Sequence, residues 1–411
     1  MLCVSLTGRP IEDALSITQK VKKQVPNIPT IWGGWHASLF PTQPLEEEIS
    51  IDITVQGQGE NTFKELVESF IKKGSLEAIK GICYRTAEGN IKKNPPRPMV
   101  NMDELPSVDY ELVDVEDYFI KKGKRQFDYI SSVGCFYRCT FCSDPYVFNR
   151  KFSAISSERM SNELEKHYKK YEFTTVNFQD ETFFTYKDRV IEMADELVKR
   201  NVKVGWAATM RADQGDRLSQ SEFNLLAKSG LKRVLVGVES GSQEMMDWLK
   251  KDIKIEQVTS TAEKCLVSKI AIQFPFIVGF PNESEEAFSK SLDFATHLSV
   301  KSKNFVPTIF YFKPYPGTPI TDDVVKKGYR LPENLREWAN FDYVSSSGPW
   351  VSNDRFVRVE RLKFYIRLSK SKYKISYPLK WVAKKRMKNK YFKYPLEKII
   401  IDKIKPSQKL S

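Results

Sequence analysis

Apolar residues gather in short runs separated by longer stretches with helical periodicity. Six runs predict buried strands, at 127–132, 174–178, 203–208, 232–238, 270–278 and 305–312. Amphipathic stretches between them, such as 156–168, 187–200 and 284–297, predict helices, many of which begin at a Ser, Thr or Asp cap. Alternation of this kind predicts an α/β domain with a parallel sheet covered by helices. Its chemistry should lie at the carboxyl ends of the strands.

The patterns divide the chain into four expected parts. Residues 1–74 alternate short strands and helices, and 75–126 form a connector with a hairpin-like pair of segments at 81–86 and 90–93. The six-strand barrel is expected over 127–345. A basic helical extension is expected over 346–411.

Charge and cysteine usage narrow the class of protein. The 411 residues carry a net charge of +13, and residues 355–411 hold 19 of the 65 basic side chains but only 3 of the 52 acidic ones. The basicity therefore belongs to the tail. Half of the six cysteines lie in one segment, which favours a reducing compartment. The first residues lack the features of a signal peptide, and no apolar run approaches the roughly 20 residues that span a bilayer. A cytoplasmic location is predicted.

The cysteine-rich segment contains Cys135, Cys139 and Cys142, directly after the first of the six strands. Ferredoxin-type segments need a fourth cysteine to saturate a 4Fe–4S cluster, and the nearest others, Cys83 and Cys265, are distant in sequence. Three cysteines therefore predict a cluster with one open iron, a feature of catalytic metal sites. The alternatives are a zinc knuckle with a distant fourth ligand, or three structural thiols.

Polar residues cluster where each of the other five strands should end. The clusters are Gln179-Asp180-Glu181, Thr209-Met210-Arg211, Glu239-Ser240-Gly241, Asn282-Glu283-Ser284 and Gly317-Thr318. Turn chemistry would explain any one of them. Five clusters after five successive strands indicate a ligand site along this edge of the sheet.

The Cys-x3-Cys-x2-Cys spacing, with Phe141 before the last cysteine, resembles the cluster loop of the radical S-adenosylmethionine (SAM) superfamily. The resemblance implies a partial (β/α)6 barrel, SAM chelated at the open iron, and a 5′-deoxyadenosyl radical formed by reductive cleavage. It also implies SAM contacts from six residues: Phe141, Asp180, Glu181, Arg211, Glu239 and Gly241. The family's more general Gly-Gly-Glu signature is absent, and Gln179-Asp180-Glu181 resembles the branch that has a cobalamin domain.

The amino-terminal part resembles the second half of a Rossmann-like cobalamin-binding domain. The matching positions, which imply cobalamin contacts, are Ser5, Thr7, Gly33, Gly34, His36, Gly57, Gly59 and Glu60. That domain begins with two further β-α units, which can supply an axial histidine, and we do not carry the axial role onto His36. Because only half of that domain's sheet would be present, we expect an exposed sheet edge and weak cobalamin binding. Three explanations for the missing units stay open: a misassigned start, a gene fragment, or a real loss of cobalamin binding.

The resemblance implies a cobalamin-dependent methyltransferase or a cyclase that acts on an unactivated carbon of a small molecule. An external donor such as ferredoxin or flavodoxin would supply the electron. A cobalamin-independent radical SAM enzyme and a non-functional truncated product are the alternatives. A methylthiotransferase is disfavoured because that family has three further cysteines in its amino-terminal domain, whereas only Cys3 and Cys83 precede the loop here.

The basic tail interleaves lysine and arginine with aromatic residues. These are Phe364, Tyr365, Tyr373, Tyr377, Trp381, Tyr391, Phe392 and Tyr394, followed by three isoleucines at 399–401. The composition predicts peripheral association with an anionic membrane face, which would suit a lipid or isoprenoid substrate. A helical appendix packed on the barrel is the alternative. Nucleic acid is not expected as a partner, because no recognised motif accompanies the charge.

Overall fold

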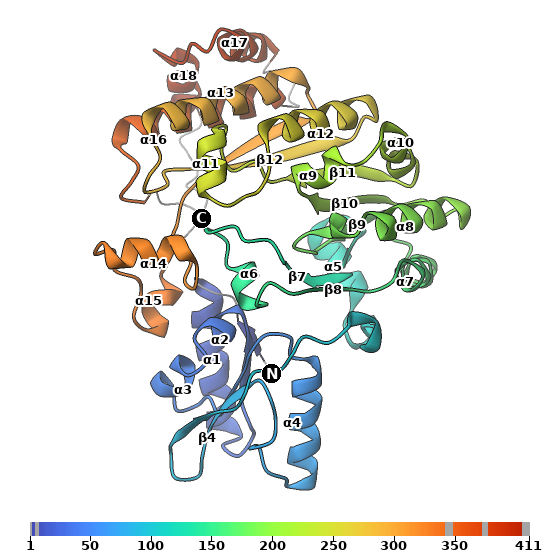
Figure 1. The fold of residues 1–411 in the computed structure, drawn as a ribbon, viewed down its shortest axis with the longest axis vertical. Helices are drawn as coiled ribbons and strands as arrows, with labels where there is room; N and C mark the ends of the chain where they lie inside the picture. Colours follow the sequence, from blue (N-terminus) through green and yellow to red (C-terminus); the bar gives the residue numbers. More distant parts are fainter. Residues whose placement is uncertain (1, 5–7, 342–347, 372–376, 405–411) are drawn as a thin grey trace. The chain divides into compact units, whose positions relative to one another are not determined.

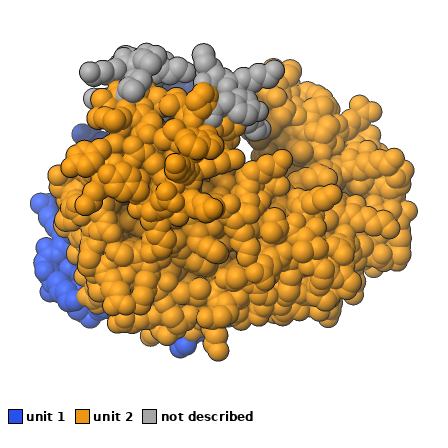
Figure 2. Space-filling view, turned by 90° about the horizontal axis from the view of Figure 1, so that it is seen from above, with its two compact units in different colours: residues 1–107, 132–155, 314–346 blue, residues 108–131, 156–313, 347–411 orange. Residues whose placement is uncertain are grey.

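The computed structural model describes residues 2–4, 8–341, 348–371 and 377–404. The chain forms two compact units, coloured separately in Figure 2. Unit 1 comprises residues 1–107, 132–155 and 314–346, and unit 2 comprises 108–131, 156–313 and 347–411. This division differs from the boundaries expected at 74, 126 and 345. Both the three-cysteine segment and residues 314–346 cluster with the amino-terminal strands.

Unit 2 is built on a sheet of six parallel strands, which confirms the six predicted strands (Figure 1). They are β6 (Gln126–Tyr129), β9 (Thr175–Phe178), β10 (Gly205–Met210), β11 (Leu231–Val236), β12 (Ala271–Val278) and β13 (Phe305–Tyr311). Neighbours in the sheet follow the chain order, and β6 and β13 lie at its two edges. Side chains alternate in burial along β12, so this strand faces two different environments. The sheet is therefore an open, partial barrel.

Several helices of unit 2 begin at a capping serine, as the sequence predicted. Ser156, Ser219 and Ser284 each accept a hydrogen bond from a backbone N–H in the first turn of the helix that follows. The helices are α5 (Val115–Lys122), α7 (Ser157–Tyr171), α8 (Lys187–Lys199), α9 (Ala212–Asp216), α10 (Gln220–Lys228), α11 (Gln243–Trp248), α12 (Ile255–Val267) and α13 (Glu285–Lys301). Short 3-10 turns lie at Tyr110–Leu112 and Phe183–Thr185.

The carboxyl-terminal extension is helical, as predicted, with α16 (Asn353–Lys370), α17 (Tyr377–Lys388) and α18 (Leu396–Ile404). Helix α16 buries Leu362, Tyr365 and Ile366, and α17 buries Ala383 and Met387. Both helices contact α13. Among the described residues, no helix is both long and apolar enough to cross a membrane.

Unit 1 contains a five-stranded sheet. The strands, in spatial order, are β1 (Leu2–Val4), β2 (Ile31–Gly34), β3 (Ile53–Val55), β4 (Ile82–Arg85) and β5 (Ile91–Lys93). The first three are parallel, and the β4–β5 hairpin adds to β3 in antiparallel orientation. The β4–β5 hairpin, which the sequence placed in a connector, is therefore part of this sheet, and β1 and β5 are its edge strands. Helices α1 (Arg9–Gln24), α2 (Trp35–Leu39), α3 (Gln43–Glu47) and α4 (Glu60–Lys72) complete this region.

Two later segments of the chain complete unit 1. The antiparallel pair β7 (Ser132–Gly134) and β8 (Phe152–Ala154) encloses the three cysteines and α6 (Asp144–Val147), and a 3-10 turn at Met102–Glu104 contacts β8. Residues 314–346 add α14 (Pro319–Lys326) and α15 (Leu335–Ala339). Leu335 and Trp338 of α15 are buried in one apolar cluster with Ile11, Trp32 and Leu45.

Candidate functional site

The three cysteines lie on a loop whose two ends are held together by the β7–β8 pair. Gly134, the last residue of β7, pairs with Phe152 of β8 and has a φ of +86°. A Cβ there would lie 2.3 Å from the backbone oxygen of Lys151, so the closure requires glycine. The backbone N–H of Ile320, in α14, donates to the backbone oxygen of Thr140 at 3.2 Å. The loop is therefore held from both its stem and its middle.

The electrostatics of the thiols suit a strongly cationic occupant. Cys139 is buried, and Cys135 and Cys142 are half-buried. Burial raises the pKa of the Cys142 thiol well above its ordinary value, and Asp144 and the two other cysteines raise it further. Three thiolates can coexist here only if positive charge compensates them, and the iron of a cluster supplies such charge.

The donor set also fits a cluster in its chemistry. No three His, Cys, Asp or Glu side chains of the described part of the chain meet at a single-ion site. A four-iron cluster binds each cysteine to a different iron, so its three ligands need not converge on one point. The loop thus offers three soft sulfur donors and leaves one iron for another ligand.

The loops at the carboxyl ends of β2 and β3 carry the glycines predicted to contact cobalamin. Gly33 and Gly34 end β2, and Gly57 and Gly59 lie between β3 and α4, whose first residue is Glu60. Ser38 joins the two loops, because its Oγ donates to the oxygen of Gly34 and accepts from the N–H of Gly57. A flat ligand could approach the backbone at these glycines. Ser5 and Thr7 lie outside the described residues.

His36 lies close to these glycines in sequence but is buried in the core of unit 1. Its ring is fully buried, 5.2 Å from the ring of Phe40 and 6.2 Å from that of Trp338 between centroids. The imidazole is a core residue in this structure, because α15 covers it. We therefore leave His36 out of the proposed ligand contacts below.

Trp35, next to His36, joins the amino-terminal sheet to the three-cysteine loop. Its ring meets that of Phe148 edge to face, with 6.3 Å between centroids, and Phe148 directly follows α6. Both side chains are half-buried. Within unit 1, the loop that follows β2 therefore packs directly on the segment that follows the cysteines.

The carboxyl ends of the strands in unit 2 gather charged residues, as the sequence predicted. The side chain of Asp180, which follows β9, is fully buried. Ser131, after β6, donates to both carboxylate oxygens, from Oγ at 2.7 Å and from its N–H at 3.2 Å. Arg189 donates to Ser131 Oγ at 2.8 Å and lies 3.9 Å from Asp180. Asp180 thus ties two strand ends together, while the adjacent Glu181 is half-buried.

Arg211 and Glu239 follow the next two strands, β10 and β11. Arg211 is 8% exposed, and its guanidinium donates to Asp213 at 3.0 Å and to the backbone oxygen of Lys251 at 2.6 Å. Glu239 accepts from Lys251 Nζ at 2.8 Å. The structure thus brings two predicted SAM contacts together through Lys251, which the sequence analysis did not single out.

Gly241 has a packing reason to be glycine. A Cβ there would lie 2.5 Å from the backbone oxygen of Lys290 and 2.8 Å from the Cα of Ser291, both in α13. Its N–H donates to Ser291 Oγ at 2.9 Å. The sequence assigned Gly241 to contact with a ligand, whereas in the structure the backbone of α13 packs closely against it. Phe141, the remaining predicted SAM contact, is half-buried on the cysteine loop of unit 1.

Glu283, after β12, is a further charged residue at this edge. Its Oε2 accepts from the N–H of Gly279 at 2.7 Å and lies 3.7 Å from Arg355 of α16. Burial raises the pKa of its carboxyl to about 7, against the lowering effects of the Gly279 hydrogen bond and Arg355. The sequence placed Glu283 in a strand-end cluster but gave it no role.

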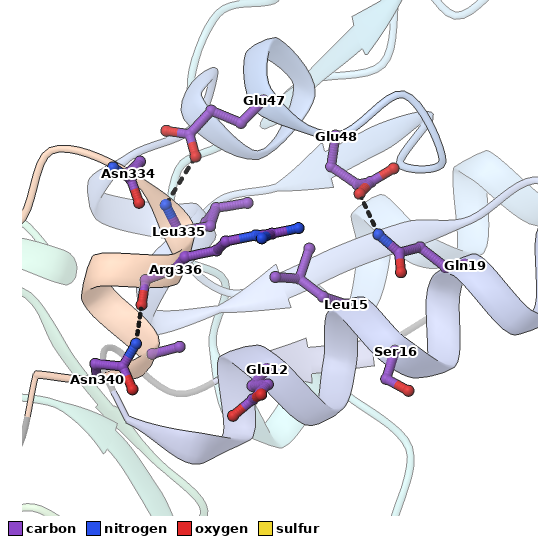
Figure 3. A pocket seen from close by; sticks show the side chains of 11 residues that line it. Glu12, Leu15, Ser16, Gln19, Glu47, Glu48, Asn334, Leu335, Arg336 and Asn340 are labelled. Carbon is purple, nitrogen blue, oxygen red and sulfur yellow. Dashed lines mark hydrogen bonds between the residues drawn. The ribbon is translucent and has the colours of Figure 1, made fainter.

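A groove in unit 1 contains none of the predicted site residues. Figure 3 shows that α1 and α15 both line it, with the Arg336 side chain between those of Leu335 and Leu15. The N–H of Leu335 donates to Glu47 at 2.7 Å, and Gln19 donates to Glu48 at 2.6 Å. The first bond secures α15 against α3, and the second joins α1 to the end of α3.

A parallel, partial α/β barrel with charged strand ends, and a loop of three cysteines without a fourth, define an iron–sulfur enzyme of the barrel type. Residues 129–295 match the model of the Radical SAM superfamily. That segment contains the three cysteines and all the strand-end charges described above. This match confirms the radical SAM resemblance and the fold class predicted from the sequence.

Relatives extend the likeness beyond the matched segment. An uncharacterized methyltransferase of Pyrococcus horikoshii is 27% identical over 89% of this chain and 78% of its own length. The anaerobic magnesium-protoporphyrin IX monomethyl ester cyclase of Rubrivivax gelatinosus is 25% identical over 91% of this chain and 66% of its own. The cobalamin-dependent SAM radical enzyme OxsB, solved with aqua-cobalamin and SAM, has a TM-score of 0.74 at 18% identity, over 99% of this chain and 65% of its own. The chain thus spans about two thirds to three quarters of these proteins.

Proposed function

We propose that Cys135, Cys139 and Cys142 hold a 4Fe–4S cluster, and that the strand-end residues of unit 2 bind SAM for reductive cleavage. The observation that supports the proposal is the set of residues inside the segment that matches the family. This segment includes the three-cysteine loop together with Asp180, Arg211 and Glu239, each at the carboxyl end of a parallel strand.

The cluster, when bound, would supply the electron that splits the sulfonium of SAM into methionine and a 5′-deoxyadenosyl radical. The chain's own residues bind and orient SAM. The Arg211 guanidinium suits a carboxylate, and the half-buried carboxylate of Glu181 suits an ammonium group. Asp180 acts through Ser131 by holding the ends of β6 and β9. Burial of this edge excludes water, which protects a reactive radical from side reactions.

We also propose that cobalamin binds at the carboxyl edge of the sheet in unit 1. The contacts would come from Gly33, Gly34, Gly57, Gly59 and Glu60, without His36. A bound methylcobalamin would supply a methyl group for an unactivated carbon of a small molecule. The relatives include a methyltransferase and a cyclase, so methyl transfer and cyclisation are both candidate outcomes.

Product analysis after anaerobic reconstitution with iron and sulfide separates these outcomes. With SAM and dithionite, we expect 5′-deoxyadenosine whether or not cobalamin is present, because cleavage depends on the cluster and unit 2. With cobalamin added, S-adenosylhomocysteine should also appear if the enzyme transfers methyl groups, and it should stay absent for a cyclase. Chromatography with mass detection measures both products. Full iron loading with no deoxyadenosine under any of these conditions would reject the proposal.

We propose further that the tail binds an anionic membrane surface, in line with a lipid or isoprenoid substrate. Its exposed apolar residues include Trp381 at 64%, Tyr394 at 74% and Leu396 at 61%. Lysines 384, 385 and 388 of α17 are also exposed. Tyr365, in contrast, is fully buried and does not serve as an anchor. Tyr373 lies outside the described residues, and the side chain of Tyr377 is likewise not described.

Sedimentation with anionic vesicles tests the membrane proposal. Because α16 packs into unit 2, point variants are a cleaner test than truncation. Replacing Lys384, Lys385 and Lys388 by glutamine should reduce pelleting, since each basic residue near such a surface contributes about 1 kcal/mol. High salt should reduce pelleting of the wild type in the same way. Equal pelleting of the variant and the wild type at low salt would contradict the proposal.

A further inference from the structure

Lys251 connects two strand ends of unit 2. It lies between α11 and α12, and its Nζ donates to Glu239 Oε1 at 2.8 Å. Its backbone oxygen accepts from Arg211 Nη2 at 2.6 Å. Arg211 follows β10 and Glu239 follows β11. Lys251 therefore holds two predicted SAM contacts: it binds Glu239 through its side chain and Arg211 through its main chain.

The Lys251–Glu239 ion pair is shielded from water. The side chains are 9% and 8% exposed. A charged side chain at such a site needs a partner, because water no longer stabilises it. Removing one member of a buried pair leaves the other charge without compensation, which is more disruptive than losing an exposed pair. The position of the Glu239 carboxylate thus depends on the Lys251 ammonium.

The backbone around the pair is adapted to it. A Cβ at Gly237 would lie 2.5 Å from Glu239 Oε1 and 3.0 Å from Lys251 Nζ, so a side chain there would displace the pair. Glu239 itself has a φ of +65°, in the left-handed region that non-glycine residues seldom adopt. Strand β12 holds it there, because the Glu239 N–H donates to Pro275 and the Glu239 oxygen accepts from Ile277. Strain of this kind persists where the surrounding structure holds it, commonly at ligand sites.

We propose that Lys251 is a positioning residue for SAM, which acts by holding Glu239 in the orientation that the ligand requires. The proposal rests on the proposed function and goes beyond it, because Lys251 lies outside the strand-end clusters. Lys251 does not touch the reacting atoms. Its loss should weaken SAM binding and leave the cleavage step itself largely unchanged at saturating SAM.

Equilibrium dialysis of the cluster-loaded, oxidised enzyme measures SAM affinity without turnover. Lys251→Met should weaken SAM binding by about tenfold or more, the range typical when a residue that supports a ligand contact is removed. Lys251→Arg should recover part of the affinity, because it keeps the charge. The neighbouring Lys250→Met is the matched control and should bind SAM as the wild type does, since Lys250 is exposed. In steady state, the Lys251→Met change should appear in KM for SAM rather than in kcat.

A double-mutant cycle with Glu239→Gln identifies the mechanism. If Lys251 acts through Glu239, then Lys251→Met should cost little further SAM affinity when Glu239 is already glutamine. The double variant also removes both buried charges, so it provides a folded protein if Lys251→Met alone does not fold. A further tenfold loss in the double variant would overturn the positioning role, and so would unchanged or tighter SAM binding by a folded Lys251→Met. A wild type that binds no SAM would instead reject the proposed function.

Discussion

Replacing Cys135, Cys139 and Cys142 together by alanine is expected to abolish the iron–sulfur cluster. The wild type should hold about four irons per chain after anaerobic reconstitution, and the triple variant should hold close to none. Each single replacement should have nearly the same effect, because the loop has no spare cysteine to take over. Iron analysis and the charge-transfer absorbance of the cluster are the measurements.

The other described thiols provide matched controls. Cys83 in β4 and Cys265 in α12 are both fully buried, and burial raises the pKa of each thiol above its ordinary value. A buried neutral thiol in apolar surroundings is unreactive. Cys83→Ala and Cys265→Ala should therefore keep full iron loading. If the triple variant keeps the cluster while its circular dichroism matches the wild type, the assignment of the three ligands is wrong.

The barrel could be predicted from the sequence because its signals are local. Each strand is a short apolar run, and several of the helices begin at a serine whose side chain caps the first turn. The bounds were less accurate where a tertiary contact intervenes. The run at 127–132 ends as a strand at Tyr129, and Ser131 instead turns its N–H and Oγ toward Asp180.

The composition of unit 1 could not be predicted because it depends on contacts between distant segments. Helix α15 has only five residues, which is too short for a periodic pattern. Yet it buries Trp338, and this side chain in turn covers His36. The Gly-Gly-x-His pattern therefore gave no sign that His36 lies among aromatic rings in the core of unit 1.

The strand-end site was predicted in part. Parallel strands place their carboxyl ends at one edge, so the sequence alone is enough to group Asp180, Arg211 and Glu239. It does not add Lys251 to them, because Lys250-Lys251-Asp252 has the composition of a solvated surface loop. The burial of Lys251 follows from the ion pair with Glu239, which only the folded chain brings together.

Replacing Trp338 by alanine is expected to destabilise unit 1 by about 3–5 kcal/mol, the usual range for a buried tryptophan. Trp338 is 1% exposed and lies 5.3 Å from Phe40 and 5.5 Å from Phe341 between ring centroids. Its backbone oxygen also accepts from the N–H of Gly8. Denaturant unfolding of the cluster-free protein, together with limited proteolysis of the amino-terminal segments, measures the loss.

Because of these contacts, removing the amino-terminal strands should also disturb the part of unit 1 that holds α15. A chain that begins at Ser75 lacks Ile11, Trp32 and Leu45, so Leu335 and Trp338 of α15 lose the cluster in which they are buried. Loss of SAM cleavage in such a chain would therefore reflect damage to unit 1, which includes the three-cysteine loop. Point variants in α15 test the dependence without removing strands.

Two further variants decide whether burial of the Trp338 ring is the cause. Among the described residues, its indole N–H has no hydrogen-bond partner, so Trp338→Phe gives up no such bond and should lose much less stability than Trp338→Ala. Arg336→Ala, at an exposed position of the same helix, should change stability by no more than about 0.5 kcal/mol. If Trp338→Ala unfolds at the same denaturant concentration as Arg336→Ala, the Trp338 ring contributes nothing to the stability of unit 1.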